Sequence, residues 1–238
     1  MKAVSELRVK IFGDGADLAG ILELSRLPHI KGFTTNPTLM RKAGVTDYRA
    51  FAREILAAVP DRPISFEVLS DDLAEIERQA RVMADWGRNV AVKIPVSTTR
   101  GEPTFDIARR LSRDGVTLNI TALTTLAQVR DAALAVAQGG LAYISVFAGR
   151  VADTGRDPVP MMAAAVELLR IAPKAQLIWA SPRELLNVFQ ADAIGCHVIT
   201  VTNDILKKAA LIGKDLDLYS LETVRMFYDD AIGSGLTV

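Results

Sequence analysis

The residue best suited to catalysis in this 238-residue chain is a lysine inside an apolar run. Lys93 lies within the run VAVKIPV at positions 90–96, where a charged side chain is costly unless it is paired or functional. A buried amine that loses its proton is a nucleophile and can attack a carbonyl carbon to form a Schiff base. The alternative is an edge-strand lysine that reaches solvent, which predicts no chemistry.

Two carboxylates occupy comparable positions. Glu67 lies in the apolar run ISFEV at 64–68, and Asp14 directly follows the run at 9–13. Ionisable groups in neighbouring apolar runs indicate a shared site. Two alternatives remain for Asp14: it could cap a helix that begins near Asp17, or it could be a phosphatase nucleophile. Such phosphatases have a second aspartate two residues later, where this chain has Ala16.

The composition restricts the partners and cofactors. The 28 basic and 28 acidic side chains balance, which argues against binding to nucleic acid or to anionic lipid. One cysteine excludes a disulfide framework and Cys-paired metal sites, and two histidines leave little for a His-based centre. We therefore predict no metal site. With no leader-like N-terminus and no apolar run of about 18 residues, we expect a cytoplasmic protein without a membrane partner.

Eight short apolar runs, separated by helical patterns, organise the chain. Most are continuously apolar, as is typical of parallel strands covered on both faces. This pattern predicts an α/β protein, a single-domain (β/α)₈ TIM barrel over residues 1–238. A doubly wound sheet is the alternative, but the glycines at 13 and 15 do not complete its phosphate-binding motif. The predicted strands are Val9–Phe12, Gly32–Thr35, Ile64–Val68, Val90–Val96, Thr117–Thr121, Tyr143–Phe147, Leu177–Ala180 and Val198–Thr202.

Capping signals predict several helix boundaries. Asp47 begins a helix whose apolar stripe runs over 48–59, and Gly87 closes the helix that covers 73–83. Further helix starts are predicted at Asp157–Pro158, at Ser181–Pro182 and at Ser220.

Polar residues follow the predicted strand ends, where barrel enzymes gather their catalytic groups. Arg150 and Arg183 each follow a strand end at which a small phosphate could sit. We expect Arg183 in the first turn of a helix, where free N–H groups also favour an anion. The complete set is Asp14, Asn36, Glu67, Lys93, Asn119, Thr121, Ser145, Arg150, Ser181 and Arg183, with Thr202 and Asn203 on the last strand.

Four of these segments together resemble the transaldolase family. They are GFTTNPTL at 32–39, VKI at 92–94, NIT at 119–121 and SVFAGR at 145–150, and the similarity extends in order from Asp14 to the strand near Val201. The resemblance implies a class I aldol reaction on a (β/α)₈ barrel, with sugar-phosphate substrates and no cofactor.

The resemblance also implies a role for each matching residue. Lys93 forms a Schiff base with the C2 ketone of a ketose phosphate, and Asp14 takes and returns the proton of the hydroxyl beside the bond that breaks. Glu67 and Thr121 hold a water for proton transfers. The remaining matches bind substrate: Asn36, Asn119 and Ser145 hold the three-carbon unit, Arg150 and Arg183 grip phosphate, and Thr35, Phe147 and Ser181 complete the lining.

Two positions favour transfer over simple cleavage. Relatives that act as free aldolases generally have Gln where this chain has Glu67 and Tyr where it has Phe147. The chain departs from many relatives at Val146 and Pro182, and Pro182 affects the expected phosphate site. Alternatives are a fructose-6-phosphate aldolase and a non-catalytic sugar-phosphate-binding barrel. The length matches the compact subfamily, which forms rings through its C-terminal helix, so we expect a homo-oligomer with contacts from residues 213–238.

Overall fold

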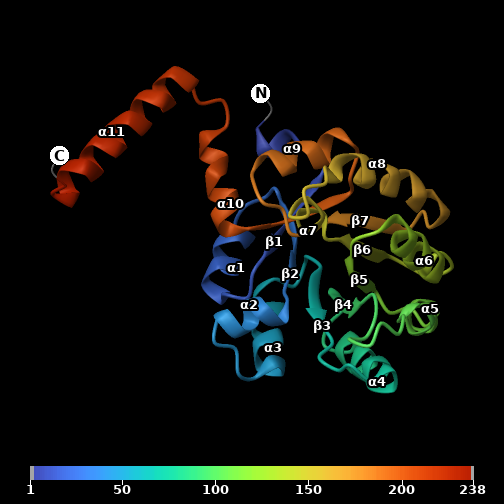
Figure 1. The fold of residues 1–238 in the computed structure, drawn as a ribbon. Helices are drawn as coiled ribbons and strands as arrows, with labels where there is room; N and C mark the ends of the chain where they lie inside the picture. The colour runs from blue at the N-terminus through green and yellow to red at the C-terminus, as the bar shows by residue number, and fades with distance from the viewer. Residues whose placement is uncertain (1–2, 237–238) are drawn as a thin grey trace.

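The computed structural model describes residues 3–236 and contains a closed barrel of eight parallel strands in sequential order (Figure 1). Every predicted strand is present, and each boundary lies within two residues of its predicted position. The (β/α)₈ prediction is therefore confirmed. The strands are β1 (Lys10–Asp14), β2 (Ile30–Thr34), β3 (Ile64–Glu67), β4 (Val90–Pro95), β5 (Leu118–Leu123), β6 (Ala142–Val146), β7 (Ala175–Trp179) and β8 (Val198–Thr202).

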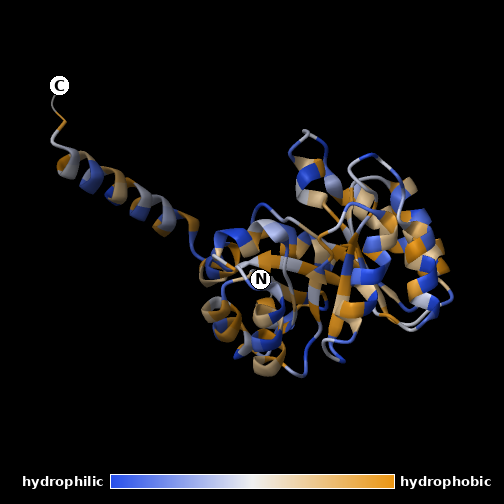
Figure 2. Cartoon of the chain, turned by 90° about the horizontal axis from the view of Figure 1, so that it is seen from below, coloured by the Kyte–Doolittle hydropathy of each residue, from blue (hydrophilic) through white to orange (hydrophobic). Residues whose placement is uncertain are grey.

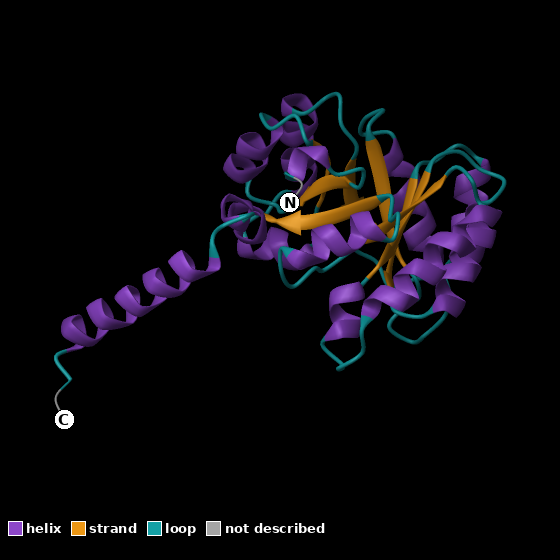
Figure 3. Cartoon of the chain, turned by 90° about the horizontal axis from the view of Figure 1, so that it is seen from above, coloured by secondary structure: helices purple, strands orange, loops and turns teal. Residues whose placement is uncertain are grey.

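Helices connect the strands and surround the barrel (Figure 3). The principal ones are α1 (Leu18–Ser25), α2 (Pro37–Lys42), α3 (Tyr48–Ala58), α4 (Leu73–Ala84), α5 (Phe105–Arg113), α6 (Leu126–Val136), α7 (Ala148–Ala152), α8 (Pro158–Leu168), α9 (Leu186–Ala193), α10 (Asn203–Lys207) and α11 (Leu216–Ser234). Short 3₁₀ segments, Val4–Glu6, Leu169–Ile171 and Lys208–Leu211, complete the described elements.

The apolar core has two separate parts. The larger fills the space between the strands and the helices. The smaller contains Phe12, Ala91, Tyr143 and Val198, and the Phe12 and Tyr143 rings meet edge to face at 5.7 Å. Side chains two residues apart on a strand share a face, so the residues that follow these four by two positions also point into the barrel. Those residues are Asp14, Lys93, Ser145 and Thr200. A layer of polar side chains thus lies inside the barrel, closer to the carboxyl ends of the strands than the apolar layer.

Two of the predicted helix starts are confirmed by capping hydrogen bonds. The Asp47 carboxylate accepts from the Ala50 amide at the start of α3, and the Asp157 carboxylate accepts from the Val159 amide at the start of α8. The predicted closure at Gly87 is wrong, because α4 ends at Ala84 with Asp85 as its C-cap and Gly87 has no positive φ.

The helix starts predicted at Ser181 and Ser220 are also wrong. Ser181 has a φ of +59° at the end of β7, and α9 begins only at Leu186. Ser220 lies inside α11, because the Asp215 carboxylate accepts from the Leu218 amide and caps that helix earlier. Serine is a common N-cap residue, but neither serine caps a helix here. Ser181 lies in the loop after β7, and at α11 the earlier Asp215 is the cap.

Helix α11 extends away from the barrel and carries no buried residue (Figures 1 and 2). Its large apolar side chains are therefore exposed, namely Leu216, Leu218, Tyr219, Leu221, Val224, Met226, Phe227, Tyr228 and Ile232. The final two residues of the predicted 213–238 segment lie outside the described part of the chain. Within residues 3–236, no helix has both the length and the apolar character needed to cross a membrane.

Candidate active site

Lys93 lies inside the barrel with a carboxylate beside it. The residue is 6% exposed, and its Nζ lies 3.1 Å from Oε2 of Glu67. The two residues face each other because β3 and β4 pair in parallel with Glu67 opposite Lys93. Nζ also donates to the carbonyl oxygen of Thr35 at 3.0 Å. The edge-strand alternative for Lys93 is wrong, because the closed barrel has no edge and the amine is buried.

Asp14 ends β1 with its carboxylate held by a neighbouring strand. The Thr34 hydroxyl lies 2.8 Å from Oδ1 of Asp14, and the two residues are register partners. Burial raises the pKa of Asp14, while the positive charge of Lys93 and the hydrogen bond from Thr34 act in the opposite direction. A carboxyl group with a raised pKa is suited to taking and returning a proton.

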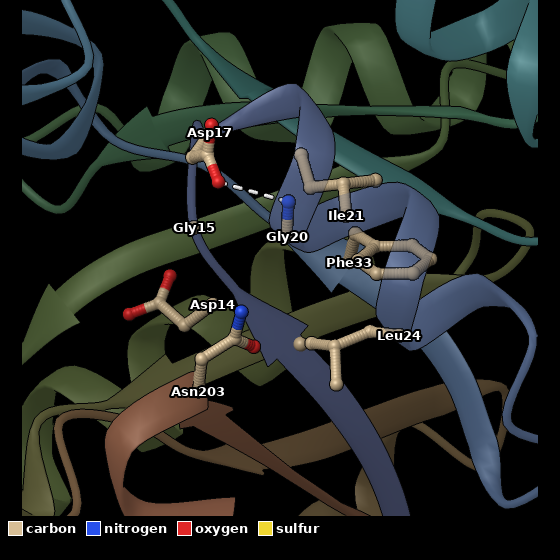
Figure 4. Close-up of a pocket in the computed structure, with 9 residues that line it drawn as sticks. Asp14, Gly15, Asp17, Gly20, Ile21, Leu24, Phe33 and Asn203 are labelled. Carbon is tan, nitrogen blue, oxygen red and sulfur yellow. Dashed lines mark hydrogen bonds between the residues drawn. The ribbon is translucent and has the colours of Figure 1, made fainter.

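The helix-cap alternative for Asp14 is wrong. Asp17 caps α1 instead, because its Oδ2 accepts from the Gly20 amide at 2.8 Å (Figure 4). Figure 4 also shows the Asp14 carboxyl group turned away from Leu24 and Phe33, which line a small cavity behind β1. The Asp14 carboxyl group therefore does not cap α1.

A buried hydrogen-bond network crosses β3, β5 and β6. Asn119 donates from Nδ2 to the Ser65 hydroxyl at 3.0 Å and accepts on Oδ1 from the Ser145 hydroxyl at 2.7 Å. All three residues are almost fully buried. Ser65 was not among the predicted site residues, although it precedes Glu67 by two positions and therefore shares its face. The network fixes the orientation of the Asn119 amide next to Lys93, its register partner.

Three other predicted site residues have distinct surroundings. The Thr121 hydroxyl is buried and has no hydrogen-bond partner among the described residues, so a bound water or a substrate oxygen could satisfy it. The Thr35 hydroxyl donates to the Ser65 carbonyl, and the Thr35 backbone carbonyl accepts from Lys93. Asn36 uses Oδ1 to cap α2 at the Leu39 amide. Its Nδ2 group is the part left to contact a ligand.

The two predicted phosphate arginines both lie at the carboxyl end of the barrel, Arg150 in α7 after β6 and Arg183 in the loop after β7. The Arg150 guanidinium stands over the Phe147 ring, 5.5 Å from its centroid. Arg183 is half-exposed and makes two hydrogen bonds to the Asp153 carboxylate, with its Nε 3.0 Å from Oδ1. Asp153 was not identified from the sequence, because nothing in its local pattern distinguishes it from a solvated loop carboxylate.

The expectation that Arg183 lies in the first turn of a helix is wrong. It precedes α9, which begins at Leu186. The backbone amides of Arg183 and Glu184 both donate to the side-chain oxygen of Asn187. Those two N–H groups are therefore satisfied within the loop and are not free to bind an anion.

Gly149 allows α7 to approach the loop that carries Ser181. A Cβ at this position would lie 1.5 Å from the Ser181 carbonyl oxygen. We expect Gly149→Ala to lower the free energy of unfolding by about 2–3 kcal/mol, because the clash is with backbone. Urea denaturation measures this effect, with Gly140→Ala as the control because open space surrounds that position. Equal losses in the two variants would show that the close approach is unimportant.

The fold and these side chains together define a class. A (β/α)₈ barrel with a buried lysine and two carboxylates at the carboxyl ends of its strands has the groups that a lysine-dependent aldolase site requires. The Transaldolase/Fructose-6-phosphate aldolase family model matches residues 11–232, and the chain belongs to this family.

Individual relatives agree with this assignment. The chain is 36% identical over 199 residues to a probable transaldolase of Dehalococcoides mccartyi, covering 83% of this chain and 88% of the relative. It is 35% identical, with the same coverage, to a probable transaldolase of a Thermoanaerobacter species. Among solved structures, a putative lyase/mutase from Burkholderia cenocepacia superposes with a TM-score of 0.57 over 87% of this chain and 82% of that chain. Its sequence identity is 16%, so it supports the fold alone.

Proposed function

We propose that the protein is a transaldolase that moves a dihydroxyacetone unit from a ketose phosphate to an aldose phosphate through a Schiff base on Lys93. The donor is sedoheptulose 7-phosphate or fructose 6-phosphate. The observation that carries the proposal is the buried amine of Lys93, 3.1 Å from Glu67 in the polar layer of the barrel. A cytoplasmic location is part of the proposal, because charged sugar phosphates do not cross membranes unaided.

The first stage joins the ketose to the enzyme. The Lys93 amine attacks the C2 carbonyl carbon, and the resulting carbinolamine loses water to give a protonated imine. Proton transfers accompany both steps. Glu67 lies beside the amine, and the unpartnered Thr121 hydroxyl offers a second polar contact for a water that carries those protons.

The second stage breaks the C3–C4 bond. Asp14 takes the proton of the C4 hydroxyl, the C4 oxygen becomes a carbonyl, and the bonding electrons move into the imine to form an enamine on Lys93. The aldose phosphate leaves. An incoming aldose phosphate then reverses these steps, and Asp14 returns the proton to the new hydroxyl.

The buried polar groups and the arginines would bind different parts of the substrate. Asn119 and Ser145, already oriented by hydrogen bonds, would contact the hydroxyls of the three-carbon unit, together with Nδ2 of Asn36. Arg150 and Arg183 would bind the phosphate, for which planar guanidinium groups are well suited. Ser181 and Phe147 would line the wall between these two regions.

We expect Arg183→Ala to raise the KM for a phosphorylated acceptor about tenfold or more, because a charge-assisted hydrogen bond contributes about 1.5–3 kcal/mol. The KM for the matching unphosphorylated aldehyde should stay nearly constant. Steady-state kinetics with glyceraldehyde 3-phosphate and with glyceraldehyde measure the two effects. Asp153→Asn is a control that leaves the guanidinium in place. Equal changes for both acceptors would contradict phosphate binding by Arg183.

Product analysis separates the proposed transfer from its alternatives. With fructose 6-phosphate and erythrose 4-phosphate, a transaldolase forms sedoheptulose 7-phosphate, which mass spectrometry detects. A free aldolase releases dihydroxyacetone steadily without an acceptor, and a non-catalytic barrel produces neither compound. Phe147 favours transfer, because its ring has no proton to give to the enamine. The three-carbon unit should therefore remain on Lys93 until an acceptor arrives.

We also propose that the active form is a homo-oligomer in which α11 packs on another copy of the chain. The helix has no buried side chain in the single subunit, and its apolar residues would otherwise remain in water. Deleting residues 215–238 should yield a monomer by light scattering, while the full chain is larger. A full-length chain that is monomeric at micromolar concentration would refute this arrangement.

A further inference from the structure

Two buried hydroxyls lie beside Asp14, and the proposed reaction does not use them. Thr34 on β2 and Thr200 on β8 are 3% and 4% exposed, and their strands are the two neighbours of β1. The Thr34 oxygen lies 2.8 Å from Oδ1 of Asp14 and 2.5 Å from the Thr200 oxygen. The three groups therefore form a continuous chain across three adjacent strands.

The number of available hydrogens determines how this chain can be arranged. The Thr34 hydroxyl has one hydrogen, which it gives to Asp14 when the carboxyl group is ionised. Its contact with Thr200 then requires the hydrogen of Thr200. When Asp14 is protonated, the carboxyl group donates to Thr34, and Thr34 donates to Thr200. Only two hydroxyl rotations separate the two arrangements, and each arrangement keeps both hydrogen bonds of the chain.

We propose that Thr200 is a positioning residue whose hydroxyl allows Thr34 to serve Asp14 in both of its protonation states. The inference rests on the proposed role of Asp14 as the proton acceptor and donor. An acid–base group must be bound well before and after each transfer. Thr34 can accept from the protonated carboxyl group, but its own hydrogen then needs another acceptor, and the Thr200 oxygen is within reach. Lys93 on β4 and Glu67 on β3 are the charged groups that act on Asp14, and neither contacts Thr200 through a hydrogen bond in the described structure.

The Thr200 hydroxyl should stabilise the ionised form of Asp14 more than the protonated form. A hydrogen bond from Thr200 polarises the Thr34 hydroxyl and strengthens its bond to the ionised carboxylate. Removing the Thr200 hydroxyl therefore raises the pKa of Asp14 further. The acidic limb of kcat/KM, which reports this group in the free enzyme, should move to higher pH.

The test compares Thr200→Val, which removes the hydroxyl at nearly constant volume, with Thr200→Ser, which keeps it. We expect Thr200→Val to lower kcat about tenfold and to move the acidic limb up by about half a unit to one unit. The KM for fructose 6-phosphate should change less than about twofold, and Thr200→Ser should return kcat to within about threefold of wild type. A wild-type acidic limb in Thr200→Val, or a serine variant as slow as the valine variant, would overturn the inference.

Thr200→Ala provides a second variant if valine does not fold, because alanine lacks the hydroxyl and is smaller than threonine. It should show the same shift of the acidic limb. Borohydride trapping on Lys93 is measured in parallel with the wild-type enzyme. Wild-type protein that traps sugar while the variants keep its pH profile refutes only the role of Thr200. Wild-type protein that traps nothing refutes the proposed reaction itself.

Discussion

Replacing Lys93 with methionine should lower kcat/KM by about 10⁴-fold or more, because no other group can form the imine that accepts the electrons of the breaking bond. Methionine has a similar length and no charge, so it fits the apolar surroundings of β4. Continuous assay of product aldose phosphate with fructose 6-phosphate and an acceptor measures this loss.

Lys31→Met provides the matched control. Lys31 is also a strand lysine, on β2, but its side chain is exposed. Its activity should stay within about twofold of wild type, since exposed substitutions away from a site have small effects. If Lys93→Met keeps more than a hundredth of the wild-type activity, the Schiff-base mechanism is refuted. Circular dichroism of both variants confirms that the comparison is between folded proteins.

Replacing Asp14 with asparagine should lower kcat by about 10²–10⁴-fold, because an amide cannot take the proton of the C4 hydroxyl. The asparagine oxygen can still accept the Thr34 hydrogen bond, so the geometry of the site is kept. Trapping of the ketose on Lys93 should therefore persist in this variant while cleavage slows. Single-turnover measurements separate the two steps, and equal loss of both would indicate that Asp14 has a structural role instead.

The same substitution should stabilise the fold near neutral pH. Because burial raises the pKa of Asp14 above its ordinary value of 3.8, the folded chain binds that proton more tightly than the unfolded chain does. The stability that this group contributes is present at low pH and is lost as pH rises through the folded pKa. Asp14→Asn should thus raise the melting temperature at pH 7 and lose this advantage toward pH 4. A variant less stable than wild type at pH 7 would contradict this reasoning.

The ionisable centre of the site could be predicted from the sequence because charges inside apolar strands are visible there. Lys93 and Glu67 interrupt runs that are otherwise apolar, and the barrel topology brings those runs together as adjacent strands. Ser65, Thr34 and Thr200 could not be identified in the same way. Hydroxyl residues are common in strands, and the importance of these three comes from partners on other strands.

Loops were predicted less well than strands, because short capping signals compete with tertiary constraints. The serine at position 181 resembles a helix cap, but the structure places it in a left-handed conformation against Gly149. The close approach of those two residues involves segments about 30 positions apart, so neither reveals it locally. The same loop holds Arg183 against Asp153, a pairing that spacing alone does not predict.

The most direct test of the account is to trap the covalent intermediate. Active protein is incubated with fructose 6-phosphate, reduced with borohydride, digested and analysed by peptide mass. We expect a reduced three-carbon unit on the peptide that contains Lys93, and no such unit in Lys93→Met. An unmodified Lys93 in folded, active protein, or an adduct on another lysine, would contradict it.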